Sequence, residues 1–492
     1  MIRSIPLFLW AYLGLHLVQA DTASLRQKFS ALKIDAVFPG DPNYVKFSTP
    51  FNRRFTYQPA AIVFPNNTNA VADSVKVGVG EKLFISPRSG GHSYAAYGLG
   101  GMDGALVVDL QRIKQIQVDA SGVAVIGTGA RLGDIALSLN SQGGRALPHG
   151  TCAGVGIGGH SSFGGYGFTS RQWGLTLDTI IGHEIVLANG SIITTSKEVN
   201  PDLFWALRGA GSSYGIITAI RFQTKPAPRQ ATNYAYDWDF TVAELANALI
   251  KLQAFCMTNL PAQLGMNANL GKSDQSGKIR LSFTGAFYGA PASFAGVVQP
   301  FPKPVGKSVT TTDWITSLQA LAGDQALSTS GKLSKYSARM DPTTERDTFY
   351  AKSLTTPQSA PMSNSSILAF SKLLINQGRA SNTSWFVQVE LYGGKNSAVT
   401  AVGADETAFT QRVILFTIQF YASSSNFAPP YPAAGFTLLD NMVDSIVNNN
   451  PTEWDYGAYA NYVDDRLSPA QWNQVKGTYD PHNVFFCPQS IT

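Results

Sequence analysis

A pair of glycines directly after a buried strand is the feature that most constrains how this chain folds. The apolar run Leu83-Phe84-Ile85 is typical of a buried strand, and the segment Ser89-Gly90-Gly91-His92-Ser93-Tyr94 then turns the chain. Paired glycines let backbone N–H groups come close to an anion, and the two serine hydroxyls add donors, so the turn suits a phosphate-bearing ligand. The imidazole of His92 could ligate a metal, act as a base or bond covalently to a cofactor. An equally good explanation is that His92 has no chemical role and is a loop residue whose ring nitrogens form hydrogen bonds with backbone groups.

A lone cysteine lies in a second glycine-dense segment. This segment reads H-G-T-C-A-G-V-G-I-G-G-H from His149 to His160 and contains Cys152. Its glycines fit the spacing of a dinucleotide fingerprint, but no strand leads directly into them, so a Rossmann site is disfavoured. We also expect no metal site, because no standard zinc spacing is matched by His149, Cys152, His160 and His183.

Together, the motifs R-S-G-G-H-S-Y, H-G-T-C-x-G-V-G-x-G-G-H and G-G-Y-G resemble the FAD-linked oxidases of the vanillyl-alcohol oxidase type. More narrowly, they resemble the secreted fungal oligosaccharide oxidases and the berberine-bridge-enzyme-like group. The resemblance implies FAD attached twice, by an 8α-methyl–histidine bond at His92 and a C6–cysteine thioether at Cys152. It also implies further cofactor contacts from Ser89, Gly90, Gly91, Ser93, Tyr94, Gly154, Val155, Gly158, Gly159, His160, Gly165, Ile217 and Asn461.

The same resemblance names a catalytic base. The segment Asn461-Tyr462-Val463-Asp464 is similar to the N-Y-x-D run of oligosaccharide oxidases, whose tyrosine accepts the proton, so Tyr462 is the expected base. Since a free tyrosine has a pKa of about 10, it needs a partner that relays its proton. The relatives place an aspartate opposite it, in W-x-x-Q-x-D-x-H-G-G-K-N-S. The run Trp385–Ser397 matches this pattern with Glu390 for the aspartate and Tyr392 for a frequent histidine. We expect the relay to survive with altered geometry.

Substrate contacts follow from the same run. Residue alternation along a strand places Gln388 and Glu390 on one face. The resemblance implies a substrate-binding set made of Gln388, Gln419, Tyr94 and Trp385. Each glutamine is equally well explained as an ordinary polar strand residue, and the alternative for Tyr462 is a packed core tyrosine.

Composition indicates a large globular chain, because 44% of its 492 residues are hydrophobic and 14% are charged. The net charge is +5, but lysine and arginine are scattered singly, so we expect no nucleic-acid partner. The resemblance implies an α+β fold with a two-part PCMH-type FAD-binding domain over 21–225. A substrate-binding domain with an antiparallel sheet backed by helices follows over 226–450, and 451–492 return to the FAD-binding domain. A proline-rich connector at 224–228 agrees with this boundary.

Periodicity predicts particular elements. In the first domain we expect a helix across Thr68–Gly78 between strands at Ala60–Phe64 and Leu83–Ile85, and a hairpin that turns at Asn189-Gly190. In the substrate-binding domain we expect strands at Asn267–Leu270, Ile279–Phe283, Trp385–Leu391 and Val413–Tyr421.

The first twenty residues have the pattern of a secretory signal peptide. Arg3 precedes the apolar run Ile5–Leu17, and small residues precede Asp21, so we expect cleavage after Ala20. The run is shorter than the ~20 apolar residues that span a bilayer, so we expect a secreted protein with no membrane segment. A glycoprotein is also expected, from sequons at Asn66, Asn189, Asn364 and Asn382.

Cysteine usage gives no disulfide framework, because the chain has only Cys152, Cys256 and Cys487. If Cys152 carries flavin, the other two could pair with each other. Nothing in the sequence indicates that they are close.

We therefore predict a secreted FAD-dependent oxidase of oligosaccharides. It would oxidise the anomeric C1 hydroxyl to a lactone, which opens to an aldonic acid, and reduce O2 to hydrogen peroxide. The alternative is a berberine-bridge-like oxidase of a secondary metabolite, which shares the flavin site but not the sugar groove. The two anchors disfavour a non-enzymatic flavin- or carbohydrate-binding protein. We expect a monomer.

Overall fold

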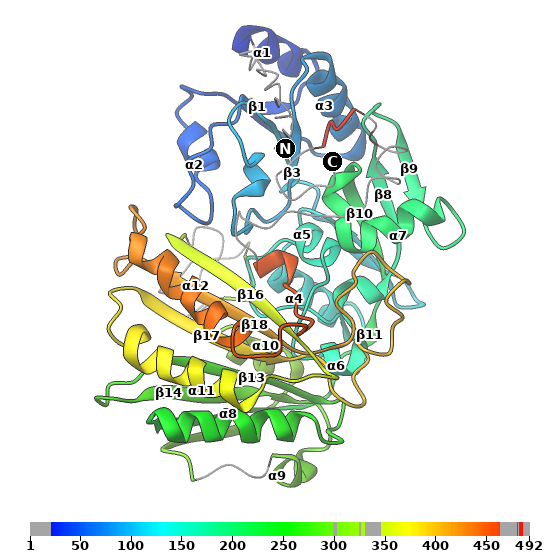
Figure 1. The fold of residues 1–492 in the computed structure, drawn as a ribbon. Coiled ribbons are helices and arrows are strands. Elements are labelled where there is room, and N and C mark those ends of the chain that lie inside the picture. Colours follow the sequence, from blue (N-terminus) through cyan, green and yellow to red (C-terminus); the bar gives the residue numbers. More distant parts are fainter. Residues whose placement is uncertain are drawn as a thin grey trace, which may run out of the picture.

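The computed structural model describes residues 21–298, 303–323, 326–329, 346–462, 480 and 482–485. Two small sheets, of four and five strands, lie above one large sheet (Figure 1), and a separate two-stranded sheet pairs Arg145–Ala146 with Lys225–Pro226. Helices and strands alternate in the upper part, whereas the lower sheet is antiparallel throughout and has helices on one face. The predicted α+β fold is confirmed.

The first small sheet has the strand order β1-β2-β4-β3. Its strands are β1 (Asp35–Val37), β2 (Ala61–Phe64), β4 (Leu106–Asp109) and β3 (Ile85–Arg88). The helix α3 (Thr68–Gly80) connects β2 to β3, and both strands pair in parallel with β4. The predicted β-α-β order is confirmed. Two further helices lie nearby, α1 (Thr22–Ala31) and α2 (Tyr44–Ser48).

The strand predicted at Leu83–Ile85 is displaced along the chain. It begins at Ile85 and continues to Arg88, because Ile85 to Arg88 pair with Leu106 to Asp109 of β4. Pro87 is tolerated inside this strand because β3 lies at the edge of the sheet. The glycine turn therefore follows the strand with only Ser89 between them.

The second small sheet is antiparallel, with the order β5-β6-β10-β8-β9. Its strands are β5 (Ile116–Val118), β6 (Val123–Gly127), β10 (Ile216–Gln223), β8 (Ile180–Val186) and β9 (Ile192–Thr195). The predicted hairpin is confirmed: β8 and β9 pair, and Gly190 has a φ of 78° in the turn between them. The elements around this sheet are α4 (Leu132–Ser141), β7 (Arg145–Ala146), α5 (Ile157–Ser162), α6 (Ser170–Trp173), α7 (Pro201–Ala210) and β11 (Lys225–Pro226).

The large sheet has the order β15-β12-β14-β13-β17-β18-β16. Its strands are β12 (Ala231–Phe240), β13 (Leu264–Lys272), β14 (Ile279–Phe287), β15 (Gly306–Thr312), β16 (Phe349–Pro357), β17 (Ser384–Leu391) and β18 (Ile414–Ser423). The four strands predicted here are confirmed as β13, β14, β17 and β18. The strands β12, β15 and β16 were not predicted.

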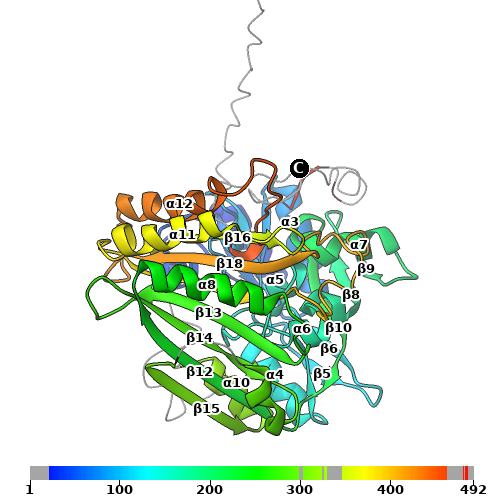
Figure 2. The same cartoon turned by 60° about the horizontal axis from the view of Figure 1, so that its bottom comes forward.

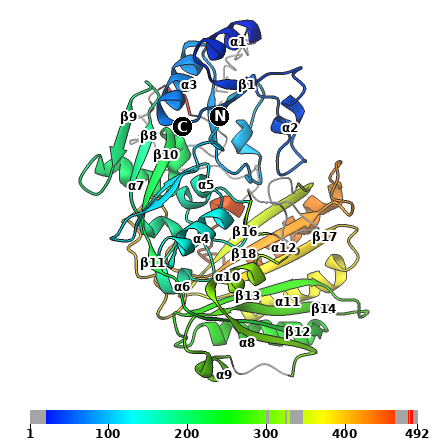
Figure 3. The same cartoon turned by 180° about the vertical axis from the view of Figure 1, so that it is seen from behind.

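One face of the large sheet is covered by three long helices, which lie side by side in Figure 2. They are α8 (Val242–Cys256), α11 (Asn364–Leu373) and α12 (Ala433–Val447). Apolar side chains of the strands and these helices form the largest hydrophobic core. The short helix α9 (Phe294–Val297) lies beside this layer, whereas α10 (Trp314–Leu321) packs near α4 (Figure 3).

The described C-terminal residues lie against the first small sheet. Ile85 N–H donates to the carbonyl of Val484, and Phe485 is buried in the core of that sheet. The expected return of 451–492 to the FAD-binding domain stays a prediction, because most of residues 463–492 lie outside the described part of the chain. In the part of the chain that the structure describes, no helix has both the length and the apolar character needed to span a bilayer.

Candidate active site

A cavity of about 420 Å³ lies between the glycine-rich loops of the N-terminal part and the large sheet. Its wall is formed by the loop that contains His92, by the segment from Gly150 to Gly167 and by side chains of β13, β17 and β18. The alternation along β17 determines which of its residues face the cavity. Val387 and Val389 pack into the helix-covered core, whereas Gln388 and Glu390 line the cavity, as predicted.

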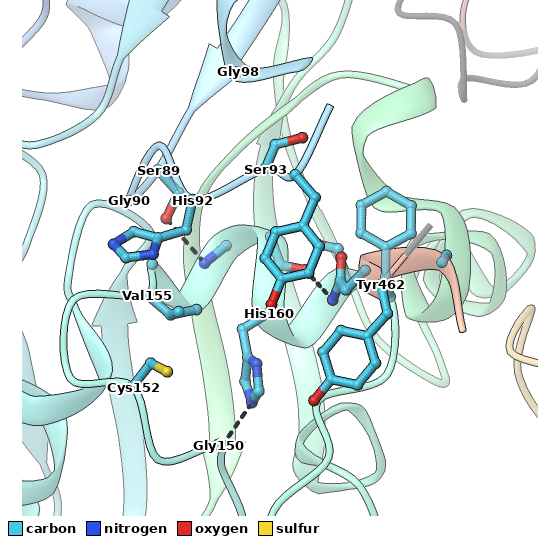
Figure 4. A pocket seen from close by; sticks show the side chains of 18 of the residues that line it. Ser89, Gly90, His92, Ser93, Gly98, Gly150, Cys152, Val155, His160 and Tyr462 are labelled. Carbon is cyan, nitrogen blue, oxygen red and sulfur yellow. Dashed lines mark hydrogen bonds between the residues drawn. The ribbon is translucent and has the colours of Figure 1, made fainter. Parts of the chain in front are cut away.

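The two predicted anchors lie on the same side of this cavity, with Val155 between them (Figure 4). The loops that contain them meet at two glycines. A Cβ built on Gly90 would lie 2.2 Å from the backbone nitrogen of Gly156, so a side chain would separate the loops. Ser89 strengthens this contact, because its hydroxyl accepts from Gly158 N–H at 3.2 Å and donates to the carbonyl of Thr128.

This wall fits a flat cofactor. Gly159 borders the cavity, and a Cβ built on it would meet no atom within 4 Å, so a planar group can lie against the backbone there. Gly91 also borders the cavity and has a φ of 73°, a backbone conformation that favours glycine. An imidazole and a thiol border the same wall. These are the nucleophiles that a covalently held flavin requires.

His160 supports the cysteine loop from within the wall. Its Nε2 accepts a hydrogen bond from Gly150 N–H at 3.2 Å, so the proton of the neutral ring is on Nδ1. Burial lowers the pKa of His160 to about 3, so the ring stays neutral at ordinary pH. His183 lies on β8 instead, where Nδ1 is 2.9 Å from the hydroxyl of Thr195. Among the described residues no group of His, Cys, Asp and Glu side chains could hold a metal ion.

The predicted base lies across the cavity from the anchors, in a short 3₁₀ turn at Ala460–Tyr462. The Tyr462 hydroxyl is 3.5 Å from Oε1 of Glu390. Its ring is parallel to that of Tyr94, with centroids 6.1 Å apart, and meets Tyr459 edge-on at 4.9 Å. Burial and the charge of Glu390 raise the pKa of Tyr462 well above its usual value.

Glu390 is buried and its own acidity is weakened. Burial raises the pKa of Glu390 to about 8, while the hydroxyls of Tyr392 and Tyr462 act in the opposite direction. Its Oε2 is buried without a hydrogen-bond partner in the described structure. Tyr392, two residues after Glu390 in the chain, stacks on Tyr166 with ring centroids 4.0 Å apart. The carboxyl group therefore borders the cavity beside aromatic rings, and its raised pKa favours the protonated form at neutral pH.

Three of the side chains predicted to bind substrate, Gln388, Gln419 and Tyr94, form a polar row along the same cavity. Gln388 and Gln419 are direct cross-strand partners in β17 and β18. The amide of Gln419 donates to the Tyr94 hydroxyl at 2.7 Å, which orients both groups toward the cavity. Asn267, opposite Glu390 on β13, extends the row and was not predicted.

The prediction that Trp385 binds substrate is wrong. Its indole lies on the other face of β17, buried in the helix-covered core, and its N–H donates to the carbonyl of Gly378 at 2.7 Å. The aromatic side chain that lines the cavity is the next one, Phe386. The alternation that places Gln388 and Glu390 on one face also places Phe386 there, so the sequence contained the signal for it.

The remaining predicted cofactor residues divide into two groups. Ser93, Val155, Gly158, Ile217 and Asn461 line the cavity. Gly154 and Gly165 do not line it. The carbonyl of Gly154 accepts from Arg131, and Gly165 N–H donates to the Tyr459 hydroxyl at 3.2 Å, so both lie behind the wall.

Two predicted features cannot be placed. Val463 and Asp464 of the N-Y-x-D run lie outside the described residues. Cys256 is buried in the core at the end of α8, but Cys487 also lies outside the described residues, so their pairing stays a prediction.

Comparison with known proteins shows first that the chain is an FAD-binding protein and then to which family of oxidases it belongs. A family described as FAD binding domain matches residues 59–196. The chain is 35% identical to the chitooligosaccharide oxidase of Gibberella zeae over 93% of this chain and 92% of that protein. It is 36% identical to the glucooligosaccharide oxidase of Sarocladium strictum over 89% of this chain and 88% of that protein.

The fold is also shared with solved structures. One is a glucooligosaccharide oxidase of Acremonium strictum described as having a 6-S-cysteinyl, 8α-N1-histidyl FAD. It superposes with a TM-score of 0.84 at 34% identity and covers 95% of this chain and 98% of that one. The chain therefore belongs to the FAD-dependent oligosaccharide oxidases. This family supports the predicted carbohydrate oxidase over the berberine-bridge-like alternative.

Proposed function

We propose that this protein oxidises the anomeric C1 hydroxyl of an oligosaccharide to a lactone and reduces dioxygen to hydrogen peroxide. FAD would be held covalently by His92 and Cys152. The proposal is supported mainly by the way the proposed anchors and catalytic residues are arranged around one cavity. Two nucleophilic anchors lie on one wall, and the Tyr462–Glu390 pair lies across from them.

Bound FAD would supply the acceptor for the hydride of substrate C1 and the group that passes two electrons to dioxygen. The protein supplies the proton chemistry. Tyr462 takes the proton of the C1 hydroxyl, and Glu390, 3.5 Å from the phenol, takes the proton of Tyr462. Transfer in this direction requires Glu390 as carboxylate, so the active form is the one that dominates above a pH of about 8.

The row of amides positions the sugar. Gln388, Gln419 and Asn267 present donors and acceptors of the kind that pair with hydroxyl groups. Phe386 on the same face offers an apolar ring against which a pyranose can pack. A site with neutral amides and one buried acid suits a neutral sugar, which agrees with the relatives named for gluco-, xylo- and chito-oligosaccharides.

Secretion, glycosylation and a monomeric state are parts of the same proposal. The sequon residues Asn66, Asn189, Asn364 and Asn382 are all exposed, which supports their availability to glycosylation. The signal pattern of residues 1–20 supports secretion.

The experiment is peroxide release from defined gluco-, xylo- and chito-oligosaccharides by the wild type, Tyr462→Phe and Tyr456→Phe. Tyr456 is 49% exposed and outside the cavity, so it is the matched control. We expect peroxide from at least one sugar, unchanged turnover in Tyr456→Phe, and a loss of about 10²–10⁴-fold in Tyr462→Phe. No peroxide from any sugar contradicts the proposal and favours an oxidase of secondary metabolites.

A further inference from the structure

The side chain of Arg131 connects the two loops that contain the anchors. Its Nη1 donates to the carbonyl of Gly90 at 3.1 Å and also to the carbonyl of Gly154. Gly90 precedes His92 by two residues, and Gly154 follows Cys152 by two residues. A single guanidinium nitrogen therefore contacts both loops, close to each anchor.

The cysteine loop is held to the start of α4 by backbone hydrogen bonds. Leu132 N–H donates to Val155 O at 3.0 Å, and Gly133 N–H donates to Ala153 O at 3.1 Å. The backbone of Arg131 also forms a bridge with Gly156. These ties involve backbone atoms only. A substitution of the Arg131 side chain therefore leaves them in place and keeps the cysteine loop next to α4.

The histidine loop is connected to the same place through side chains and a close contact between glycines. It meets the cysteine loop at the Gly90–Gly156 contact and through Ser89, whose hydroxyl accepts from Gly158 N–H. The Gly90 carbonyl is tied to this site by Arg131. Arg131 does not line the cavity, so its action on a cofactor would pass through these two loops.

We propose that Arg131 is a positioning residue that sets the spacing of His92 and Cys152, so that both bonds form on one flavin. The inference rests on the bicovalent attachment in the proposed function. Both anchors must reach fixed positions on one rigid ring, and a displacement of about 1 Å costs on the order of 10²-fold in rate. Without the bond from Arg131, the His92 imidazole could still reach the flavin ring. It would do so less often in the position that also lets Cys152 bond to the same ring.

Each attachment replaces one C–H bond of the flavin, together with the N–H bond of His92 or the S–H bond of Cys152, by one C–N or C–S bond. The two hydrogens leave as two electrons and two protons. Dioxygen, the oxidant of the proposed reaction, accepts them and becomes hydrogen peroxide.

The test compares wild type, Arg131→Met, Arg131→Lys and Arg145→Met as purified holoproteins. Arg145 is the matched control, because its guanidinium also donates to a backbone carbonyl, but that carbonyl belongs to Thr224 and to neither anchor loop. After tryptic digestion, mass spectrometry measures how much of the His92 peptide and the Cys152 peptide is joined through one flavin. Thermal unfolding of the same samples measures stability.

We expect the joined species to dominate in wild type and Arg145→Met. Arg131→Met should accumulate flavin on one peptide alone, and Arg131→Lys should restore part of the joined species. Thermal stability of Arg131→Met should match that of Arg145→Met. If Arg131→Met does not fold, Arg131→Lys must still show a deficit of joined peptide.

Complete joining in Arg131→Met, or in Arg131→Lys where only that variant folds, overturns the role of Arg131. It leaves the proposed function intact. A wild type without joined peptides overturns the bicovalent attachment itself, and the role of Arg131 with it.

Discussion

The phenolic oxygen of Tyr462 lies 3.5 Å from Oε1 of Glu390, and both side chains border the same cavity. Burial raises the pKa of both groups, that of Glu390 to about 8. At neutral pH the resting pair is therefore largely uncharged. Tyr462 can take the proton of a sugar hydroxyl only if Glu390 is ionised and can accept the proton of Tyr462. The rate of oxidation should therefore depend on the ionisation of Glu390, and so on pH.

We expect kcat/KM for an oligosaccharide to rise with pH and to level off above a pH of about 8, because only the Glu390 carboxylate can accept the proton of Tyr462. Glu390→Gln should lower activity and remove this inflection. The measurement is peroxide release at saturating oxygen between about pH 5 and 9. A rate independent of pH in the wild type, or the same inflection in Glu390→Gln, contradicts the assignment.

Glu390→Gln should also change stability in a pH-dependent way. The folded pKa of about 8 lies above the unfolded value of about 4.3, so the folded state holds this proton more tightly. The stability from this group is complete below the unfolded pKa and is lost as pH rises through the folded pKa. The melting temperature of Glu390→Gln should therefore exceed that of wild type near pH 8, with the excess vanishing near pH 4. An excess that is the same at both pH values would refute this.

Neighbouring aromatic residues on β17 should respond differently to substitution. Phe386→Leu removes a ring from the cavity wall, so KM should rise by about three- to tenfold, and the lost stacking on Tyr421 should cost roughly 0.5–1.5 kcal/mol of stability. Trp385→Phe removes one of the two hydrogen bonds that the Gly378 carbonyl accepts, the other coming from Ser381 N–H, so it should cost about 0.5–1.5 kcal/mol of unfolding free energy with KM unchanged. Steady-state kinetics and urea unfolding measure both. The reverse pattern of KM values would show that Trp385 faces the sugar.

Arg171 should be important for joining the N-terminal part to the large sheet. It is buried on α6, and its guanidinium donates to the backbone carbonyls of Leu260, Pro261, Leu264, Gly393 and Lys395. Arg171→Met should lower the free energy of unfolding by about 3 kcal/mol or more, because several buried carbonyls lose their donor. The exposed Arg221→Met is the control and should change it by less than about 0.5 kcal/mol. Equal unfolding curves for the two variants would exclude this role.

The sequence predicted the parts of the site that depend on local pattern. The glycine turns require particular backbone geometry, and strand alternation assigned Gln388 and Glu390 to the cavity face. The same alternation excludes Trp385 from that face. The error arose because Trp385 was assigned by its place in a motif rather than by its parity along the strand.

Other features could not be read from local pattern. The strand β15 is the polar edge segment Gly306–Thr312, with mostly exposed residues and no apolar alternation. Its position depends on pairing with β12, which is distant in the sequence. The bonds from Arg131 and Arg171 likewise join backbone atoms of remote segments, and nothing in the residue order encodes them.

The most direct test of the whole account is the mass of the denatured protein after acid precipitation, for wild type, His92→Ala, Cys152→Ala and the double variant. We predict that wild type has the mass of one added FAD less two hydrogens for each bond. Each single variant should keep flavin through its remaining anchor, and the double variant should be colourless. A wild type that releases its flavin into the supernatant, or a double variant that retains it, would contradict the account.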